Sequence, residues 1–390
     1  MDVTSGTASG TPDPDDALAA LEARARREVD AGLLPSCQWA IARDGEVVAG
    51  ATVGEVPAGD DTRYLMYSCT KAVVASAIWQ LLAEGTLRLD QRVAELIPEF
   101  ASNGKDVVTV EQVLLHTAGF PAAPFAPEHW GSREARLAAF DRWRLDWEPG
   151  TRFQYHASSA HWVLAELIER IDGDDFRLAI ARRVLHPLGL KALALGVPEA
   201  EQGDIALPRL VGEPATTAEW EEALGISSFD VGEVTDHALL EVAEPGPLAA
   251  GLPGGGGVST AADLARFYQG LLHDDAHMWD PAVLADATGH VRNHFADPQT
   301  GVPANRALAV VLAGDDGRAA MRGFGHATSP LAFGHGGAGG QIAWADPVSG
   351  LSFAWFTNGL DRHYLRQWRR TSGIASRAGA VGAGPPARRP

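Results

Sequence analysis

The chain contains little cysteine, little lysine and no long hydrophobic segment. Its only two cysteines, Cys37 and Cys69, are too few for a disulfide framework or for a zinc site built from cysteines. No apolar run reaches the roughly 18 residues that a membrane-spanning helix needs. With 390 residues, 46% hydrophobic and 21% charged, the sequence is typical of a globular protein that is long enough for two lobes.

Positive charge is also scarce, and the formal net charge is −18. Nucleic acids and anionic membrane surfaces are bound by basic faces, so we expect neither as a partner. The first residues, MDVTSGTASGTPDPDD, have neither the basic start nor the apolar segment of a secretory signal. We therefore expect a cytoplasmic protein whose partner is a small molecule.

Strand patterns occur near both ends of the chain, and helical patterns fill the middle. An Asp-Gly pair at 44–45 separates two apolar runs and predicts a hairpin. Residues 110–280 are mostly helical in pattern, whereas short apolar runs after residue 305, cut by Gly, Asp-Pro and Asn-Gly, predict strands. This order predicts an α/β (α+β) fold: one antiparallel sheet built from both chain ends and flanked by helices, with a mostly helical lobe inserted.

The same patterns set the expected boundaries. We expect disordered tails over residues 1–15 and 376–390, because both are rich in Gly, Pro and Ala or in small polar residues. Residues 16–110 and 300–375 would form the α/β domain, and residues 111–299 the helical lobe. A cleft between the two lobes is the default place for a site.

The segment YSCTK, residues 67–71, opens an apolar helical run and contains one of only three lysines. These are Lys71, Lys105 and Lys191, and the other 29 basic residues are arginine. Ser68 and Lys71 are three positions apart, so on a helix they project from one face. Apolar surroundings lower a lysine pKa, and a neutral amine can deprotonate a serine. Arginine cannot do this, because it stays protonated in proteins.

The same spacing has an ordinary structural explanation. Ser68 would cap the helix and Lys71 would lie at the surface, and spacing alone favours this interpretation. A second Ser-x-x-Lys, Ser102 to Lys105, surrounds an Asn-Gly pair, and we interpret it as a solvated turn. The scarcity of lysine and the apolar helix bring the two interpretations of Ser68 level, so the decision needs partners elsewhere in the chain.

Five motifs follow one another along the chain: YSCTK at 67–71, LLHTAGFP at 114–121, FQYHASSAHWVLAELI at 153–168, GLPGGGGVSTAADLARFYQGLL at 251–272 and FGHGGAGGQIAWADPVSG at 333–350. Their order and spacing resemble the serine β-lactamase and penicillin-binding-protein superfamily, specifically its class C-like branch. That branch holds class C β-lactamases, D-specific peptidases and amidases, family VIII carboxylesterases and some transesterases. The resemblance covers roughly residues 16–370 and implies a β-lactamase/transpeptidase-like fold.

The resemblance assigns the chemical step to three residues. Ser68 would be the acylated nucleophile, and Lys71 the amine that activates it. Tyr155 would carry protons to and from the serine and the leaving group. A tyrosine does this best as a phenolate, which two nearby cations would favour. No metal or organic cofactor is implied.

The resemblance also implies a binding edge. His335, Gly336 and Gly337 fall on the family's Lys-Thr-Gly triplet, which lines the site from a strand edge where glycines allow close approach. The oxyanion hole would use the backbone N–H groups of Ser68 and Ala338.

Two departures from the family pattern bear on the substrate. Ala157 stands where the family often has an asparagine that binds a substrate amide, and His335 replaces a lysine whose charge would hold a carboxylate. A histidine can still be partly cationic near pH 6–7. We therefore expect a serine hydrolase acting on small esters, a carboxylesterase or transesterase. A D-amino-acid amidase or peptidase, a β-lactamase, and a catalytically silent ligand-binding module are the alternatives, although a silent module would not need both Ser68 and Lys71.

Other reactive-looking residues have simpler explanations. Cys69 is rotated about 100° from Ser68 on a helix, so we expect a small buried residue. For His116 and His156 we favour buried structural histidines, and His156, next to Tyr155, is also a candidate substrate contact. His290 and His294 lack the acidic partner of a metal motif. The glycines at 254–257 lack the ending of a phosphate loop and predict a close-packed turn before a helix capped by Ser259 or Thr260.

Overall fold

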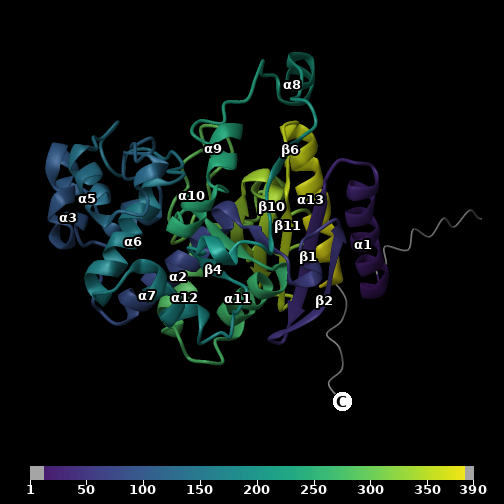
Figure 1. Cartoon of the computed structure of the whole chain (residues 1–390), viewed down its shortest axis with the longest axis horizontal. Helices are drawn as coiled ribbons and strands as arrows, with labels where there is room; N and C mark the ends of the chain where they lie inside the picture. The colour runs from purple at the N-terminus through teal and green to yellow at the C-terminus, as the bar shows by residue number, and fades with distance from the viewer. Residues whose placement is uncertain (1–12, 383–390) are drawn as a thin grey trace, which may run out of the picture.

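The computed structural model describes residues 13–382. Its centre is a six-stranded sheet in the order β2-β1-β11-β10-β9-β8, in which all neighbours are antiparallel. The strands are β1 Ser36–Arg43, β2 Glu46–Gly54, β8 Val311–Leu312, β9 Phe333–Gly337, β10 Gln341–Asp346 and β11 Leu351–Thr357. The predicted hairpin at 44–45 joins β1 to β2, and the sheet is built from both ends of the chain, as predicted (Figure 1).

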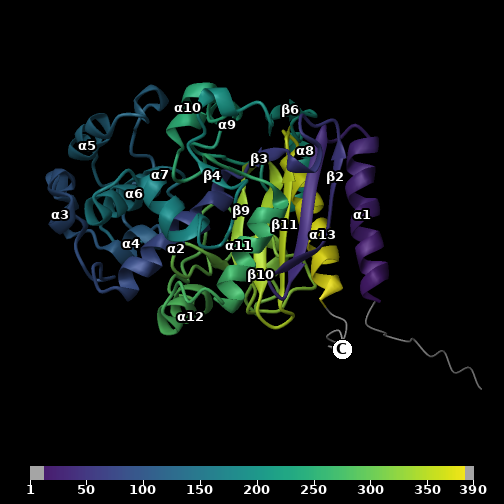
Figure 2. The same ribbon diagram turned by 60° about the horizontal axis from the view of Figure 1, so that its bottom comes forward.

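Side chains alternate between the two faces of this sheet according to size. Trp39, Trp344 and Trp355 face one core, which helices α1 (Pro14–Asp30) and α13 (Tyr364–Val381) cover. Their neighbours on the opposite face include Ala40 and Ala343. These small residues let helix α11 (Ala261–His273) pack close to β1, β10 and β11 (Figure 2). The sheet therefore lies between helical layers.

The other helices are not confined to one lobe: most lie to the left of the sheet in Figure 1, whereas the helix over residues 217–224 lies at the top of the view. They are α2 Thr70–Ala83, α3 Val93–Leu96, α4 Val110–Leu114, α5 Arg133–Arg142, α6 Ser159–Asp172, α7 Phe176–Ile180, α8 Thr217–Leu224, α9 Asp236–Glu241, α10 Pro245–Ala250 and α12 Pro281–Gly289. Six short strands form two smaller sheets: β3 Arg63–Leu65, β4 Ala194–Leu195, β5 Ile205–Ala206 and β7 Gly257–Ser259 in one, β6 Arg209–Val211 and β12 Gly359–Asp361 in the other.

Several boundaries differ from expectation. Helix α1 begins at Pro14, and α13 continues to Val381 because Ala378 packs in the core beside the sheet, so residues 376–381 are helix and not tail. The rest of both predicted tails, 1–12 and 383–390, lies outside the described residues. Helix α11, expected in the helical lobe, packs on the large sheet. The division at residues 111 and 299 stays a prediction.

The predicted strand at 306–314 is only two residues long. Asn305 and Ala309 have positive φ angles of 45° and 66°, which extended strands do not adopt. The chain reverses here, and the Ala307 N–H donates to the Val310 carbonyl oxygen at 3.0 Å. As a result Arg306 pairs with Val311 across a tight turn next to β8.

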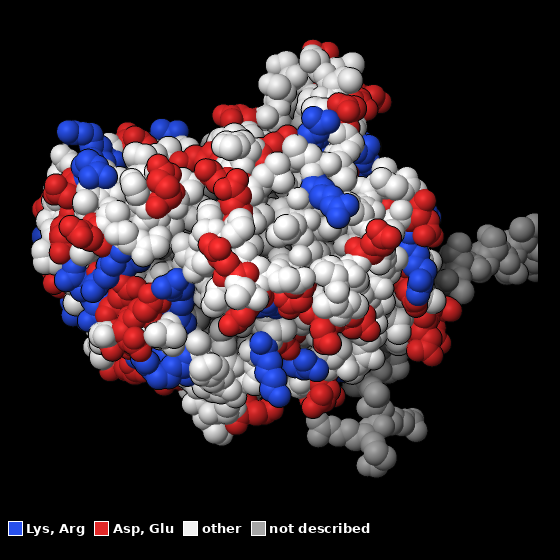
Figure 3. Space-filling view, viewed as in Figure 1, with Lys and Arg blue, Asp and Glu red and all other residues white. Residues whose placement is uncertain are grey.

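The surface agrees with the charge argument from the sequence. On the face shown in Figure 3, acidic and basic residues are interspersed, with no continuous basic surface. Among the described residues, no helix is both long and apolar enough to cross a membrane. The cytoplasmic location stays a prediction.

The second Ser-x-x-Lys segment is a turn, but our interpretation of it as solvated was wrong. Lys105 is fully buried, and its amine donates to the carbonyl oxygens of Ser102 and Trp143, both at 2.6 Å. Asn103 and Gly104 have positive φ angles, so the chain turns back and directs the lysine inward. Through its bond to the Trp143 carbonyl oxygen, Lys105 holds this turn against the end of α5.

We expect Lys105→Met to lower the free energy of unfolding by about 2 kcal/mol or more, because two buried carbonyl groups lose their donor. Urea denaturation measures this loss. Lys191→Met, which changes an exposed lysine, should stay within about 0.5 kcal/mol of the unmodified protein. Equal midpoints for the two variants would contradict the role assigned to Lys105.

Candidate active site

Ser68 lies in a tight turn, Tyr67–Cys69, directly before helix α2. Tyr67 has a positive φ of 43°, which is unusual for an aromatic residue, and its hydroxyl donates to the Leu239 carbonyl oxygen at 3.0 Å. The Thr70 hydroxyl donates to the Tyr67 carbonyl oxygen at 2.6 Å and accepts the Gly257 N–H. The turn is thus held from three sides, while Ser68 itself remains partly exposed.

The Lys71 amine lies 3.2 Å from Ser68 Oγ, the proximity that their spacing predicts. Lys71 is fully buried, and its amine donates to the carbonyl oxygens of Ala157 at 2.7 Å and Gly254 at 2.5 Å. Burial, reinforced by the Arg306 charge, holds the pKa of Lys71 well below its ordinary value. A neutral amine has two N–H groups and one lone pair, so the two carbonyls leave its lone pair for the Ser68 hydroxyl.

The glycine-rich segment at 254–257 is the predicted close-packed turn. A Cβ atom on Gly254 would lie 2.9 Å from the Ala157 carbonyl oxygen and 3.2 Å from the Lys71 nitrogen. Only glycine lets this backbone approach the amine. Helix α11 follows, and the Thr260 side chain caps it by accepting the Asp263 N–H.

Tyr155 lies beside the same amine. The Lys71 nitrogen and the Arg306 guanidinium carbon are each 5.0 Å from the centroid of its ring. Two basic side chains therefore lie near Tyr155, as the resemblance led us to expect, but the expected phenolate is wrong. Burial raises the pKa of Tyr155 to about 12, and the Arg306 charge offsets only part of this effect. Near neutral pH the group is a phenol, whose hydroxyl is buried without a hydrogen-bond partner among the described residues.

His335 lies on β9 and is also neutral, so it does not carry the partial charge that a histidine can have near pH 6–7. Burial, followed by the Arg306 charge, holds its pKa well below the ordinary value. Its Nδ1 lies 2.6 Å from the Gly336 carbonyl oxygen and its Nε2 lies 3.3 Å from Arg306 Nη1. The ring therefore carries its proton on Nδ1 and accepts the arginine N–H at Nε2. Sequence reasoning missed Arg306, and its only signal was a charge within an apolar run.

Strand β9 runs directly beside the turn that carries Ser68. The Cys69 thiol donates to the His335 carbonyl oxygen at 3.1 Å, and a Cβ on Gly337 would lie only 2.5 Å from the Met66 carbonyl oxygen. Ala338 follows at the end of this strand. The roles of Gly336 and Gly337 in binding, and of Ser68 and Ala338 as oxyanion donors, stay predictions.

Cys69 is the buried residue that we expected. It is 0% exposed, and burial raises the pKa of its thiol far above the ordinary value, so it cannot supply a thiolate. His290 and His294 follow the end of α12 and do not share a helix. Within residues 13–382 no group of three or more His, Cys, Asp or Glu side chains could hold a metal ion.

His156 does not face a substrate. Its Nδ1 lies 2.6 Å from the Gln154 carbonyl oxygen, and its Nε2 accepts the Phe120 N–H at 3.1 Å. Both ring nitrogens are used inside the protein, so the candidate substrate contact was wrong and the structural interpretation is correct. His116 is also buried, and its Nδ1 accepts the His156 N–H at 3.3 Å. His161 on α6, which we had not singled out, lies buried beside it with ring centroids 6.2 Å apart.

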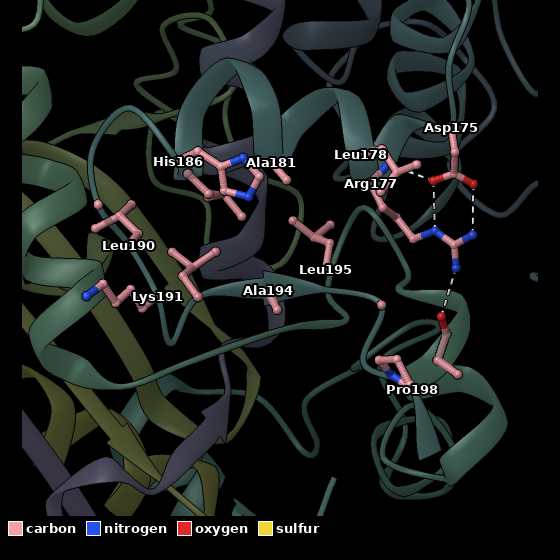
Figure 4. A pocket seen from close by; sticks show the side chains of 15 residues that line it. Asp175, Arg177, Leu178, Ala181, His186, Leu190, Lys191, Ala194, Leu195 and Pro198 are labelled. Carbon is pink, nitrogen blue, oxygen red and sulfur yellow. Dashed lines mark hydrogen bonds and ion pairs between the residues drawn. The ribbon is translucent and has the colours of Figure 1, made fainter. Parts of the chain in front are cut away.

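A cavity of about 940 Å³ lies elsewhere, between α7 and β4 (Figure 4). Five leucines are among the 15 residues that line it, and at one side Arg177 is paired with Asp175 and donates to the Ala249 carbonyl oxygen. None of the candidate catalytic residues borders this cavity. The cavity is therefore separate from the candidate site at Ser68.

Comparison with known proteins agrees with this geometry. Residues 21–374 match the Beta-lactamase family. The chain is 29% identical to Esterase/beta-lactamase LipL of Mycobacterium tuberculosis over 79% of this chain and 72% of that protein. It is 28% identical to Esterase EstB of Burkholderia gladioli over 63% of this chain and 67% of that protein.

Solved structures give the same result for the fold. A penicillin-binding protein homologue from Caulobacter crescentus superposes with a TM-score of 0.74, at 29% identity, over 93% of this chain and 98% of that one. The predicted resemblance and fold class are therefore confirmed. Because the family match extends over nearly all of the described residues, we conclude that this chain belongs to the beta-lactamase family.

Proposed function

We propose that the protein is a serine hydrolase that forms an acyl-enzyme on Ser68 and acts on small esters as a carboxylesterase or transesterase. The observation that carries this proposal is the buried Lys71 amine, which lies 3.2 Å from Ser68 Oγ and contacts two carbonyl oxygens. In its neutral form this amine directs its lone pair at the Ser68 hydroxyl. The esterase names of LipL and EstB support the reaction class.

The reaction begins with proton transfer from the Ser68 hydroxyl to the neutral Lys71 nitrogen as Oγ attacks the ester carbonyl. The N–H groups of Ser68 and Ala338 hold the developing oxyanion. Because Tyr155 is a phenol, it can donate its proton to the leaving alkoxide and regain one from the Lys71 ammonium. Water then attacks the acyl-enzyme by the reverse path, and an alcohol in its place would make the reaction an acyl transfer.

Two features favour an ester over an amide or a β-lactam. Ala157 offers no side-chain amide, and its carbonyl oxygen is already occupied by Lys71. His335 is neutral and its Nε2 is occupied by Arg306, so it cannot hold a substrate carboxylate in the way that a lysine would. An ester without a carboxylate needs neither contact.

A panel of three substrates tests this preference: p-nitrophenyl butyrate, a chromogenic cephalosporin and a D-alanyl amide. We expect the butyrate ester to give the highest kcat/KM of the three on the purified protein. Faster turnover of the amide or the cephalosporin would assign the protein to the amidase or β-lactamase alternative instead.

Labelling with a fluorophosphonate tests the nucleophile. We expect one adduct on the unmodified protein by intact-mass spectrometry and none on Ser68→Ala. Ser102→Ala is the matched control, because Ser102 has the same spacing to a buried lysine and should leave labelling intact. An unlabelled native protein would instead favour a silent ligand-binding module.

The rate of that labelling should depend on pH through Lys71. Only the neutral amine accepts a proton, so the rate rises with pH and reaches half its maximum at the pKa of Lys71, well below the ordinary 10.5. Lys71→Arg keeps a long basic side chain that stays protonated, and we expect a loss of about 100-fold or more at every pH. A half-maximum near 10.5, or an active Lys71→Arg variant, would refute this role.

A further inference from the structure

Arg306 is a buried arginine without an acidic partner at ion-pair distance among residues 13–382. It is 7% exposed, and its Nε has no hydrogen-bond partner in that part of the chain. Its guanidinium lies over the rings of Tyr155 at 5.0 Å and Phe153 at 5.6 Å, and Nη1 is bonded to His335. Burying a charge without a counter-ion is costly, and proteins ordinarily avoid it. We therefore expect Arg306 to have a functional role that offsets the free-energy cost of burying its charge.

The groups around Arg306 are almost all basic. Six titratable side chains have their pKa changed by the Arg306 charge or change the pKa of Arg306. They are Lys71, His116, Tyr155, His161, His335 and Asp297. Asp297 is the single acid in this set, and it does not reach ion-pair distance. A proton added to any of the four lysine or histidine side chains would place a second positive charge next to the first.

We propose that Arg306 is a positioning residue of this site, whose fixed charge keeps the Lys71 amine and the His335 ring neutral and orients the histidine. The proposal rests on the proposed function of Ser68 and Lys71. The His-Gly-Gly triplet lacks the lysine charge of the family's Lys-Thr-Gly triplet. The Arg306 guanidinium supplies a positive charge next to His335 instead. From there it acts on the base that deprotonates the serine.

The size of the effect follows from the geometry. The Lys71 nitrogen and the Arg306 guanidinium carbon are each 5.0 Å from the centroid of the Tyr155 ring, so they are at most about 10 Å apart. At an effective dielectric constant of about 20, two charges at that distance shift a pKa by about one unit. The direction agrees with Arg306 lowering the pKa values of Lys71, His116 and His335.

The turn before β8 makes this placement possible. Arg306 is held by its own backbone, because its N–H donates to Asn293 and its carbonyl oxygen accepts from Arg292 and Asn293. The charge is thus attached to a fixed loop and does not depend on the catalytic side chains for its position. Its contact with His335 selects the ring tautomer that donates to the Gly336 carbonyl oxygen.

The test is the pH dependence of fluorophosphonate labelling in Arg306→Met. Removing the charge raises the pKa of Lys71, so we expect the acidic limb to move up by about one pH unit. Labelling should recover to within a few-fold of native at high pH. The control is Arg152→Met, an exposed arginine over the Trp147 ring that should leave the limb in place.

An unmoved limb in a folded Arg306→Met protein, or a loss of rate that is equal at every pH, would overturn the proposal. Because Arg306→Met could fail to fold, a second measurement uses the native protein. Ring ¹⁵N NMR of histidine-labelled protein, assigned with His335→Gln, should show His335 neutral and protonated on Nδ1 at pH values where an ordinary histidine is already charged. Titration of His335 near 6.5 would also overturn it. This readout does not depend on the reaction of Ser68 with fluorophosphonate. A failure of the Ser68 assignment would therefore be recognised separately from a failure of the Arg306 proposal.

Discussion

The site depends on how one buried amine satisfies its hydrogen bonds. Lys71 lies on α2, and its nitrogen contacts the carbonyl oxygens of Ala157, before α6, and Gly254, before β7. An ammonium would have three N–H groups but only two carbonyls to receive them, and its third would point at Ser68. The Ser68 hydroxyl could accept that third N–H, so the hydrogen bonds alone fit both forms of Lys71, and burial together with the Arg306 charge favours the neutral amine. The two carbonyl contacts also hold together three segments that are far apart in the sequence around the nucleophile.

Lys105 shows that this outcome does not follow from the Ser-x-x-Lys spacing. It too is buried, it too donates to two carbonyls, and burial lowers its pKa to about 8. Its serine, however, donates its own hydroxyl proton to the Asp141 carbonyl oxygen and supports a turn. Both serines are partly exposed, and the difference is the surroundings: Ser68 lies beside Tyr155 and β9, whereas Ser102 faces the end of α5. The same Ser-x-x-Lys spacing therefore stabilises a turn at residues 102–105 and forms a candidate catalytic pair at residues 68–71.

Local patterns predicted much of the fold, and long-range contacts account for what they missed. The Asp-Gly hairpin, the helix after Ser68 and the strands near the C-terminus were all readable, because turn residues and periodicity are local signals. Arg306 was not, since its meaning comes from Tyr155 and His335, which lie far away in the sequence. The error about His156 has the same origin: its ring nitrogens are used by Gln154 and Phe120, and the second of these contacts is not a pattern in the sequence.

Proton positions in the site follow from the same charges. Moving a proton from the Tyr155 phenol to the Lys71 amine would create a phenolate and an ammonium in a buried place. Arg306 favours the phenolate and disfavours the ammonium, so its two effects on that transfer oppose each other. Burial then determines the result, and it favours the neutral pair. Arg306 opposes the addition of a further proton to the Tyr155–Lys71 pair. With that proton Lys71 would be an ammonium and could not act as a base. The fixed charge of Arg306 can therefore set how many protons Tyr155 and Lys71 hold together, without determining which of the two holds them.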